Sequence, residues 1–412
     1  MLTRREFLMK GLGSAVLIPG LIAGGSPLSG AFALAGDPAP SHTPPTETSF
    51  ACLTTSGKPY DIGLSVGRTF AGEIGMGLER RQKWLIRLRD YAEGPGKKNY
   101  ETMLGASKEH ASQVIEELKG WAWGSGVGFD DLFTVNCNPE LDAFMERDTA
   151  VPPGGCSTVV VCDEKRLLVV HNEDHNFNYA DLMFVMKAAP ESGNDFLCLS
   201  YPDFMEGNAP AVNRHGIVLT TNYIGSREVK AGIPRYFIHR MVMESKTIDE
   251  ALNAAQNPLR AFASHHIVAS LKEKKAFSIE LTPSHAQIRE IKGLYIHTNH
   301  LILDKMKDLP QFDKYVKLSS IPRYKYLSKT LGAVKDPGDI TPELVVKAMS
   351  SHEGRPFSVC RHHEGEAEGA TVACAVFSSE HHGGDKPYGM KLYKNNPCMG
   401  RATDYKLKAQ KS

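Results

Sequence analysis

The spacing of apolar residues changes at residue 156, and this change constrains the fold more than any other feature of the sequence. Before it, residues 66–91 and 106–123 carry apolar side chains three and four positions apart, as amphipathic helices do. After it, residues 157–162 and 166–170 are β-branched runs around a polar turn, which predicts a hairpin with at least one buried strand. The chain therefore joins a helical first part to a sheet-forming remainder.

Further strands and helices follow in blocks. Thr247 with Glu250, and Thr341 with Pro342, mark the starts of two helices. Strands, then helices, then strands favour sheets that pack on each other with helices outside, an α+β fold. We expect strands at 216–223, 266–271, 276–281, 286–291, 294–298, 357–360, 371–377 and 388–393, and helices at 234–245, 248–255, 321–331 and 342–350.

The first 35 residues resemble a twin-arginine export signal. Arg4 and Arg5 are followed by an uncharged run rich in Gly and Ala, and we place the signal cleavage after Ala35. The prolines and glycines of this run make a poor membrane-spanning helix, so we expect no stable membrane anchor. The predicted location is therefore the periplasm or the outside of the cell. Residues 36–48 contain four prolines and are expected to form a linker.

Composition excludes several classes of function. Lys and Arg number 48 against 47 Asp and Glu, so the chain has no basic surplus with which to hold a nucleic acid. Eight cysteines in 412 residues are too few for a disulfide scaffold. His171 and His175 lie four residues apart, as in a zinc-binding helix, but no acid stands at the second position of an H-E-x-x-H motif. The segment also follows a strand and lacks helical character. We expect no metal and no cofactor.

The segment Pro152-Pro153-Gly154-Gly155-Cys156 is bent and ends at a cysteine that begins a buried strand. A cut between Gly155 and Cys156 would give Cys156 a free α-amine, with a pKa of about 7.7 to 8.0, that can accept the proton of its own thiol. Gly155 suits such a cut because a residue without a Cβ tolerates a strained peptide. Taken alone, Cys156 also fits the commoner roles of a small buried hydrophobe or half of a disulfide.

Seven short motifs occur in order along roughly 300 residues. They are Gly57-Lys58-Pro59-Tyr60-Asp61-Ile62-Gly63, Gly155-Cys156, Asn172-Glu173-Asp174, Asn213-Arg214-His215-Gly216-Ile217 leading to Asn222, Gly232-Ile233-Pro234, His297-Thr298-Asn299-His300, and His352 to Cys360. In these motifs the chain resembles the isopenicillin N acyltransferase (acyl-coenzyme A:6-aminopenicillanic acid acyltransferase) family of self-processing N-terminal-nucleophile hydrolases. The resemblance implies an αββα four-layer sandwich of that type and a self-catalysed cut between Gly155 and Cys156.

The resemblance also implies roles for single residues. Cys156 matches the nucleophile, and Asp174 matches the carboxylate that orients the new ammonium or polarises the thiol. Asn222 and Asn299 match two asparagines whose amide N–H groups suit an oxyanion hole, since they donate without titrating. Substrate contacts are expected from His171, Asn172 and Tyr223.

The expected protein is an exported amidohydrolase that cleaves a small N-acyl amide or peptide through a thioester. Residues 49–155 and 156–412 would form one domain and remain together as a heterodimer after the cut. One alternative is acyl transfer from a donor such as acyl-coenzyme A to a β-lactam or other amine, but that donor is a cytoplasmic metabolite. A solute-binding protein is an alternative of another class, and it would need no cut.

Overall fold

The computed structural model describes residues 40–145, 155–364, 369–380 and 386–408. The predicted export signal with its cleavage site, and the residues Pro152 to Gly154 before the junction, lie outside this range. The described residues belong to one compact unit that begins at Pro40. None of the described helices combines the length and the apolar character that a membrane crossing requires.

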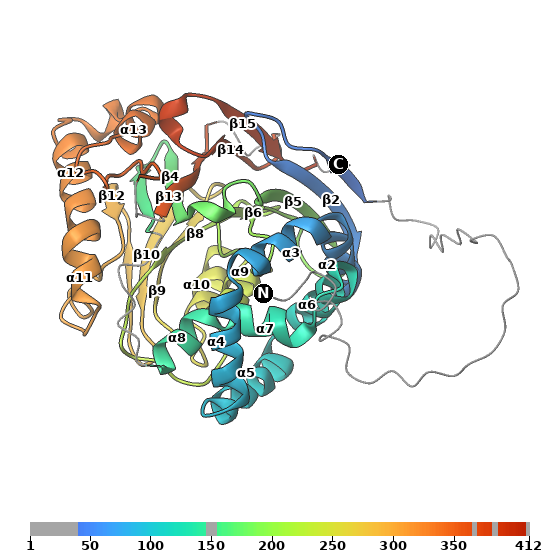
Figure 1. Cartoon of the computed structure of the whole chain (residues 1–412). Coiled ribbons are helices and arrows are strands. Elements are labelled where there is room, and N and C mark those ends of the chain that lie inside the picture. Colours follow the sequence, from blue (N-terminus) through green and yellow to red (C-terminus); the bar gives the residue numbers. More distant parts are fainter. Residues whose placement is uncertain (1–39, 146–154, 365–368, 381–385, 409–412) are drawn as a thin grey trace, which may run out of the picture. The chain divides into compact units, whose positions relative to one another are not determined.

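Two β-sheets form the centre of the molecule (Figure 1). Every neighbouring pair of strands is antiparallel except β2 and β5, which are parallel. The nine-stranded sheet has the order β1 (Ser41–Thr43), β2 (Ala51–Gly57), β5 (Phe184–Pro190), β6 (Phe196–Ser200), β7 (Ala211–Asn213), β8 (Ile217–Tyr223), β9 (Ser264–Ser270), β10 (Lys275–Leu281) and β11 (Ala286–Glu290). The six-stranded sheet has the order β12 (Gly293–His297), β3 (Ser157–Cys162), β4 (Leu167–Asn176), β13 (Gly369–Ser378), β14 (Gly389–Lys394) and β15 (Ala402–Lys406).

Strand β3 shows how the sheets are layered. Its Val160 belongs to the main core, which both sheets share, whereas Val159 and Val161 on its other face pack against helices α12 (Ile321–Gly332) and α13 (Pro342–Met349). Successive side chains of a strand point to opposite faces, so β3 is buried on both sides, as its β-branched run predicts.

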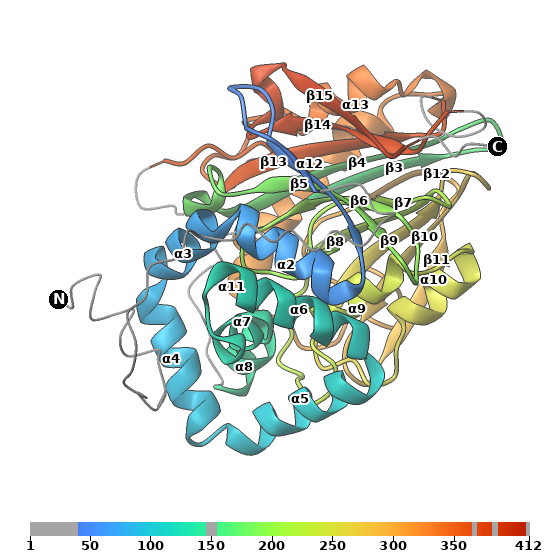
Figure 2. The same cartoon turned by 90° about the vertical axis from the view of Figure 1, so that its right-hand side faces the viewer.

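The far face of the nine-stranded sheet is covered by helices from two parts of the chain (Figure 2). These are α2 (Pro59–Thr69), α3 (Ala71–Arg80), α4 (Gln82–Glu93), α5 (Lys97–His110), α6 (Ser112–Ser125), α7 (Phe129–Asn136) and α8 (Asn138–Phe144), together with α9 (Arg235–Val242) and α10 (Ile248–Ala255). With α12 and α13 on the opposite side, the order of layers is helix, sheet, sheet, helix. The αββα expectation is confirmed.

Helices α2 and α6 approach each other at four glycines. A Cβ on Gly63 would lie 1.8 Å from the Glu117 carbonyl oxygen, and one on Gly120 would lie 2.0 Å from the Tyr60 carbonyl oxygen. Gly67 and Gly124 repeat these contacts one turn further on. Backbone therefore packs directly on backbone, which only glycine permits.

Three of the segments with an expected structure differ from that expectation. Residues 66–91 form parts of three helices, because Phe70 and Arg81 adopt non-helical backbone angles at the joints. Residues 357–360, expected as a strand, form a loop in which the Cys360 N–H donates to the Ser351 carbonyl (2.9 Å). Within the expected linker, Ser41–Thr43 pairs with the edge of β2, although its side chains are exposed.

The predicted helix starts at Thr247 and Thr341 are confirmed. The hydroxyl of Thr247 accepts a hydrogen bond from the Glu250 N–H, and that of Thr341 accepts one from the Leu344 N–H, each at 3.2 Å. Both threonines have extended backbone angles, as N-cap residues do.

Candidate active site

A cavity of about 740 Å³ opens beside the start of β3. Five of the residues singled out from the sequence line it, namely Gly155, Cys156, Asp174, Asn222 and Tyr223. Three others, His171, Asn172 and Asn299, are buried behind its wall. Strands of both sheets thus bring their polar ends to one place.

Cys156 directly precedes β3 and is 6% exposed. Burial raises the pKa of its thiol well above the ordinary value, and the nearby carboxylates of Glu173 and Asp174 act in the same direction. Arg323, which donates to the Cys156 carbonyl oxygen (2.8 Å), opposes this increase only weakly. The thiol of the uncut chain is therefore protonated at neutral pH and needs a base before it can attack.

Gly155 lies against a wall of polar atoms. A Cβ at this position would lie 1.8 Å from the Tyr315 hydroxyl, 2.9 Å from Arg323 Nη2 and 3.0 Å from Asn299 Oδ1. Its N–H donates to the Asp174 carbonyl oxygen (3.2 Å). Lack of space thus requires glycine before Cys156.

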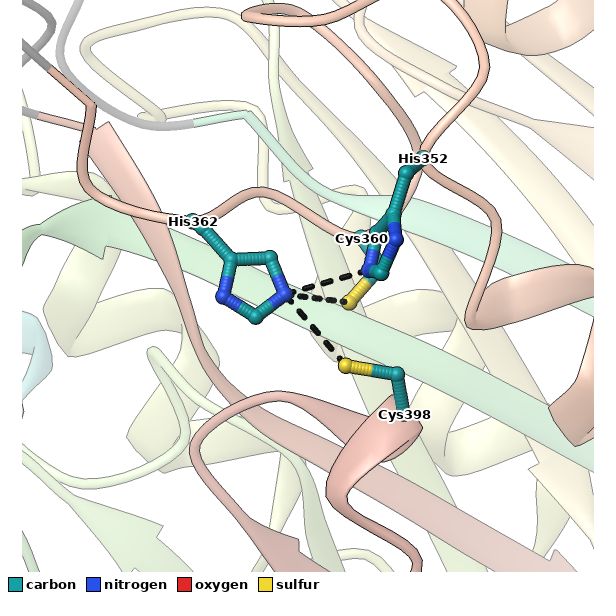
Figure 3. Close-up of side chains that lie close together, drawn as sticks. All are labelled: His352, Cys360, His362 and Cys398. Carbon is teal, nitrogen blue, oxygen red and sulfur yellow. Dashed lines mark hydrogen bonds between the residues drawn. The ribbon is translucent and has the colours of Figure 1, made fainter.

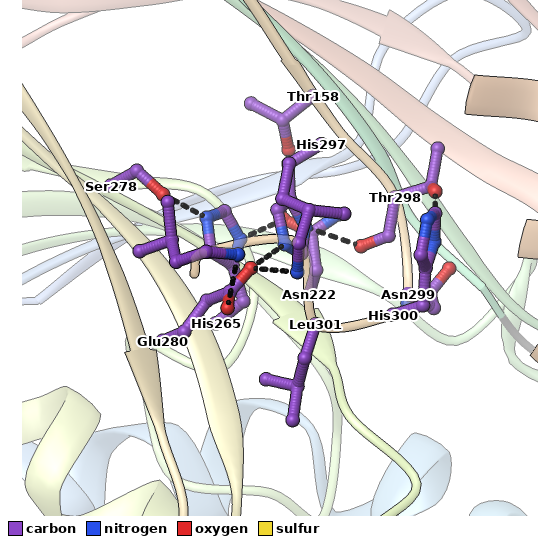
Figure 4. Close-up of polar contacts among 12 residues, drawn as sticks. Thr158, Asn222, His265, Ser278, Glu280, His297, Thr298, Asn299, His300 and Leu301 are labelled. Atoms are coloured by element: carbon purple, nitrogen blue, oxygen red, sulfur yellow. Dashed lines mark hydrogen bonds and ion pairs between the residues drawn. The ribbon is translucent and has the colours of Figure 1, made fainter. Parts of the chain in front are cut away.

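Asn222, near the end of β8, lines the cavity, and Figure 4 shows its side chain among the polar residues around it. Its Oδ1 accepts a hydrogen bond from the Thr158 hydroxyl (3.0 Å) and lies 3.0 Å from His265 Nδ1. Its Nδ2 is buried and has no hydrogen-bond partner among the described residues. Because the oxygen is held by two groups, the unused N–H donors are fixed in position, as an oxyanion hole requires.

Asn299 follows β12 and differs from Asn222, because hydrogen bonds hold both ends of its side-chain amide. Its Nδ2 donates to the Tyr223 carbonyl (3.0 Å), and its Oδ1 accepts from Tyr315 (3.0 Å) and from Arg323 (2.7 Å). The structure therefore places Asn299 behind Gly155, where it orients Arg323, and one of its N–H groups is already engaged.

Asp174 combines a bound oxygen with a free one. Oδ1 accepts from the Thr371 hydroxyl (2.6 Å), whereas Oδ2 makes no hydrogen bond with a described residue and lies 3.7 Å from Arg361 Nε. Burial raises the pKa of Asp174 to about 6, although the Arg361 guanidinium lowers it. A buried acceptor beside Cys156 is suited to a new ammonium group.

Glu173 is part of the site and was not anticipated. Its Oε1 accepts from the Tyr201 hydroxyl (2.7 Å), and its Oε2 lies 3.0 Å from His171 Nε2. His171, expected to contact substrate, is instead held between Glu173 and Thr158 (2.8 Å). The Cys156 sulfur, one ring nitrogen of His171 and one carboxylate oxygen of Glu173 all lie within 4.8 Å of one another. The alternation of side chains along β4 could have identified Glu173 from the sequence, since it places His171 and Glu173 on the same face of the strand.

Arg323 of α12 was also missed. It is buried and donates to the Cys156 carbonyl, to Ser157 Oγ (2.8 Å) and to Asn299. In the sequence it resembles any basic residue on the polar face of a helix, so no local pattern identifies it.

Asn172 was expected to contact substrate, but the structure gives it a different position. Its side-chain amide donates to the carbonyl oxygens of Met349 and Val359, each at 2.9 Å, on the side of β4 that faces α13. It is a fully buried structural residue that ties the loop after α13 to the sheet.

Arg235, the first residue of α9, adds a cation to the cavity wall. Its guanidinium carbon lies 5.0 Å from the ring centres of both Tyr223 and Tyr236. Its Nε is buried without a hydrogen-bond partner in the described part of the chain. The cavity that Cys156 lines is therefore also lined by a cation with an unused donor.

The arrangement of cysteine, carboxylate and free amide at one junction can be compared with known proteins. The model of the acyl-coenzyme A:6-aminopenicillanic acid acyl-transferase family matches residues 161–385. The chain belongs to this family. The resemblance drawn from the seven motifs is thereby confirmed, and the match runs from the end of β3 through β13.

Relatives of this acyl-transferase family member include a hydrolase. The chain is 24% identical over 387 residues to the beta-alanyl-dopamine/carcinine hydrolase of Drosophila melanogaster, and the match covers 86% of this chain and 95% of that protein. Among solved structures, it is similar to the Caenorhabditis elegans ortholog of N-acylethanolamine-hydrolyzing acid amidase. That match has a TM-score of 0.40 and 14% identity, and covers 54% of this chain and 92% of the other.

Proposed function

We propose that this protein is an exported cysteine amidohydrolase that cuts itself between Gly155 and Cys156 and then hydrolyses a small N-acyl amide. Membership of a family of amidases and acyltransferases supports the chemistry. The observation that carries the proposal is that Cys156 lines one cavity together with Asn222 and Asp174. The Asn222 Nδ2 and the Asp174 Oδ2 make no hydrogen bond with a described residue.

The cut begins with attack of the Cys156 sulfur on the Gly155 carbonyl carbon. The peptide C–N bond breaks as the C–S bond forms, so the acyl group moves to sulfur and the nitrogen leaves as the α-amine of Cys156. Water then hydrolyses this thioester and leaves Gly155 as a carboxylate.

Turnover uses the same sulfur. The new α-amine accepts the thiol proton, and the thiolate attacks the amide carbonyl of the substrate. The Asn222 amide donates to the resulting oxyanion, and Asp174 Oδ2 accepts a hydrogen bond from the ammonium. The ammonium then gives its proton to the leaving amine, and water releases the acyl group as an acid.

Hydrolysis is favoured over acyl transfer for two reasons. An exported enzyme would rarely meet acyl-coenzyme A, and the Drosophila relative is named as a hydrolase. The free donor on Arg235 would bind a carbonyl or carboxylate oxygen of the substrate away from the scissile bond.

The test of self-processing is the mass of the purified protein under denaturing conditions. We expect two chains, residues 36–155 and 156–412, and a single uncut and inactive chain for Cys156→Ala. Cys162→Ala removes another buried cysteine, at the far end of β3, and should cut normally. An active wild-type preparation that remains one chain would overturn the cut, and a solute-binding protein would remain uncut and inactive.

The test of the reaction is release of free amine from a panel of N-acyl amides that includes carcinine and beta-alanyl-dopamine. We expect release without added coenzyme A by wild type and none by Cys156→Ala. Release that depends on coenzyme A would favour the acyltransferase alternative. A form without residues 1–35, retained in the cytoplasm, should cut itself equally well if folding precedes export.

A further inference from the structure

Four side chains of metal-binding type meet at one point outside the catalytic cavity (Figure 3). They are His352, Cys360, His362 and Cys398, and their potential ligand atoms all lie within 4.8 Å of one another. Three come from the loop that follows α13, and Cys398 comes from a short 3₁₀ turn (Pro397–Met399) between β14 and β15. The loop and the turn are far apart in sequence, so spacing alone does not group these residues.

The distances fit one tetrahedral metal ion. His362 Nε2 lies 3.1 Å from His352 Nε2, 3.3 Å from Cys398 Sγ and 3.9 Å from Cys360 Sγ. A zinc ion with Zn–N bonds of about 2.0 Å and Zn–S bonds of about 2.3 Å separates its nitrogen and sulfur ligands by about 3.3 to 3.8 Å. The observed spacings lie close to this range.

Hydrogen bonding alone explains the cluster poorly. One imidazole nitrogen is either a donor or an acceptor, yet His362 Nε2 faces a nitrogen and two sulfurs at once (Figure 3). A disulfide between Cys360 and Cys398 would give the two histidines no role, and both cysteines are free. A shared cation accounts for all four side chains together.

We propose that His352, Cys360, His362 and Cys398 bind a structural Zn²⁺ ion. Two thiolates and two imidazoles are a ligand set that zinc prefers, and a site filled by four protein ligands has no open position for catalysis. Asn396 Nδ2 donates to Cys360 Sγ (3.3 Å), which is the kind of outer contact that orients a thiolate ligand. No metal was expected from the sequence, because the pair considered there, His171 and His175, does not include any of these four residues.

The ion would position a residue of the active site. Arg361 lies between the ligands Cys360 and His362, and its side chain points the other way, to Ser319 Oγ and toward Asp174 Oδ2 (3.7 Å). Its backbone N–H donates to Thr371 Oγ1 (2.9 Å), the hydroxyl that also binds Asp174. Because the residues on both sides of Arg361 would bind the zinc ion, the ion would fix the loop that holds Asp174.

The test measures zinc in the full-length purified protein by elemental analysis. We expect roughly one Zn²⁺ per chain, loss of that zinc in Cys398→Ser and in His362→Gln, and retention in Cys52→Ser, a half-buried cysteine elsewhere. Cys156→Ala should also retain it, which separates this site from the Cys156, His171 and Glu173 group. Because zinc content does not depend on turnover, failure of the proposed function would not affect this result.

A second measurement covers variants that fail to fold. Replacing the metal of wild type with Co²⁺ should give the visible absorption of a tetrahedral cobalt–thiolate site, and removing it with a chelator should lower the melting temperature. Wild type without zinc, a Cys360–Cys398 disulfide found by mass spectrometry, or zinc retained in both ligand variants would each overturn the proposal.

Discussion

Asn222 and Asn299 were expected to act as a pair, but the structure gives their amide groups different surroundings. The Asn299 amide is held by Tyr223 and holds Arg323, whereas the Asn222 amide has its acceptor bound and its donors free. At the scale of single residues, the unpartnered donor is the group that can respond to a developing negative charge.

Replacement of Asn222 by Asp tests this role. The aspartate keeps an oxygen for Thr158 and His265 but loses the N–H donors, so we expect turnover to fall by about 100-fold to 1000-fold while the melting temperature changes little. Asn222→Ala should lose as much activity and also some stability. Normal turnover with weaker substrate binding in the Asp variant would make Asn222 a substrate contact instead.

Asp174 should set the acidic limit of activity. Burial raises its pKa to about 6, and the carboxylate form is the one that can hold the ammonium of Cys156, so kcat/KM should fall as the pH drops below about 6. Thr371→Val removes a hydrogen bond that lowers this pKa, so the limit should move to higher pH. Thr403→Val, which removes a hydroxyl bonded to the Thr48 carbonyl, is the control and should leave the profile in place.

The same carboxyl has a defined effect on stability. Its folded-state pKa lies above the ordinary 3.8, so between about pH 4 and pH 6 the folded chain binds more protons here than the unfolded chain. The contribution of Asp174 to the free energy of unfolding therefore falls as the pH rises through that window.

For activity, a pH profile of Thr371→Val identical to that of wild type would show that a group other than Asp174 sets the acidic limit.

At the scale of elements, the contact of α2 with α6 depends on glycine. Gly63→Ala places a methyl group against the Glu117 carbonyl, so we expect the free energy of unfolding to fall by about 3 kcal/mol. Gly75→Ala, in the exposed part of α3 with no atom within 4 Å of its new Cβ, should raise it by about 0.5 to 1 kcal/mol. Denaturant unfolding measures both free energies. If Gly63→Ala changed the free energy of unfolding as Gly75→Ala does, α2 and α6 would be able to move apart.

Most elements with a local signal were predicted, and elements fixed by distant partners were not. The β-branched run of β3 and the capped start of α13 were both identified from the sequence. Strand β2 was missed, because it owes its place to pairing with the distant strand β5. Strands β5 and β6 were also missed, although the turn-forming residues 191–195 join them in a hairpin. Residues 357–360 were predicted as a strand from their apolar character. In the structure Val359 packs against α13, and the segment has no strand partner among the described residues.

The candidate site was predictable to a similar degree. Cys156, Asp174 and Asn222 stand in short ordered motifs, and the structure gathers them in one wall. Arg323 and the four proposed zinc ligands have no such motif, since only the folded chain brings their helix, loop and turn together.

At the scale of the whole molecule, the two products of the proposed cut should remain together. Strand β2 pairs with β5 over seven residues, and α2 and α6 pack against the same sheet, so the first product forms part of the second one's core. We expect cut protein to elute as one species under native conditions, and to separate only in denaturant. A free fragment in native buffer would contradict this pairing.

The pairing of β2 with β5 also orders events during synthesis. A ribosome completes β2 long before β5, and β1 covers only one edge of β2. Until β5 emerges, the other edge of β2 has no strand to join, so the early helices cannot settle on a finished sheet. Completion of this sheet must therefore follow translation of much of the chain, and the proposed export of an already folded protein requires the same order of events.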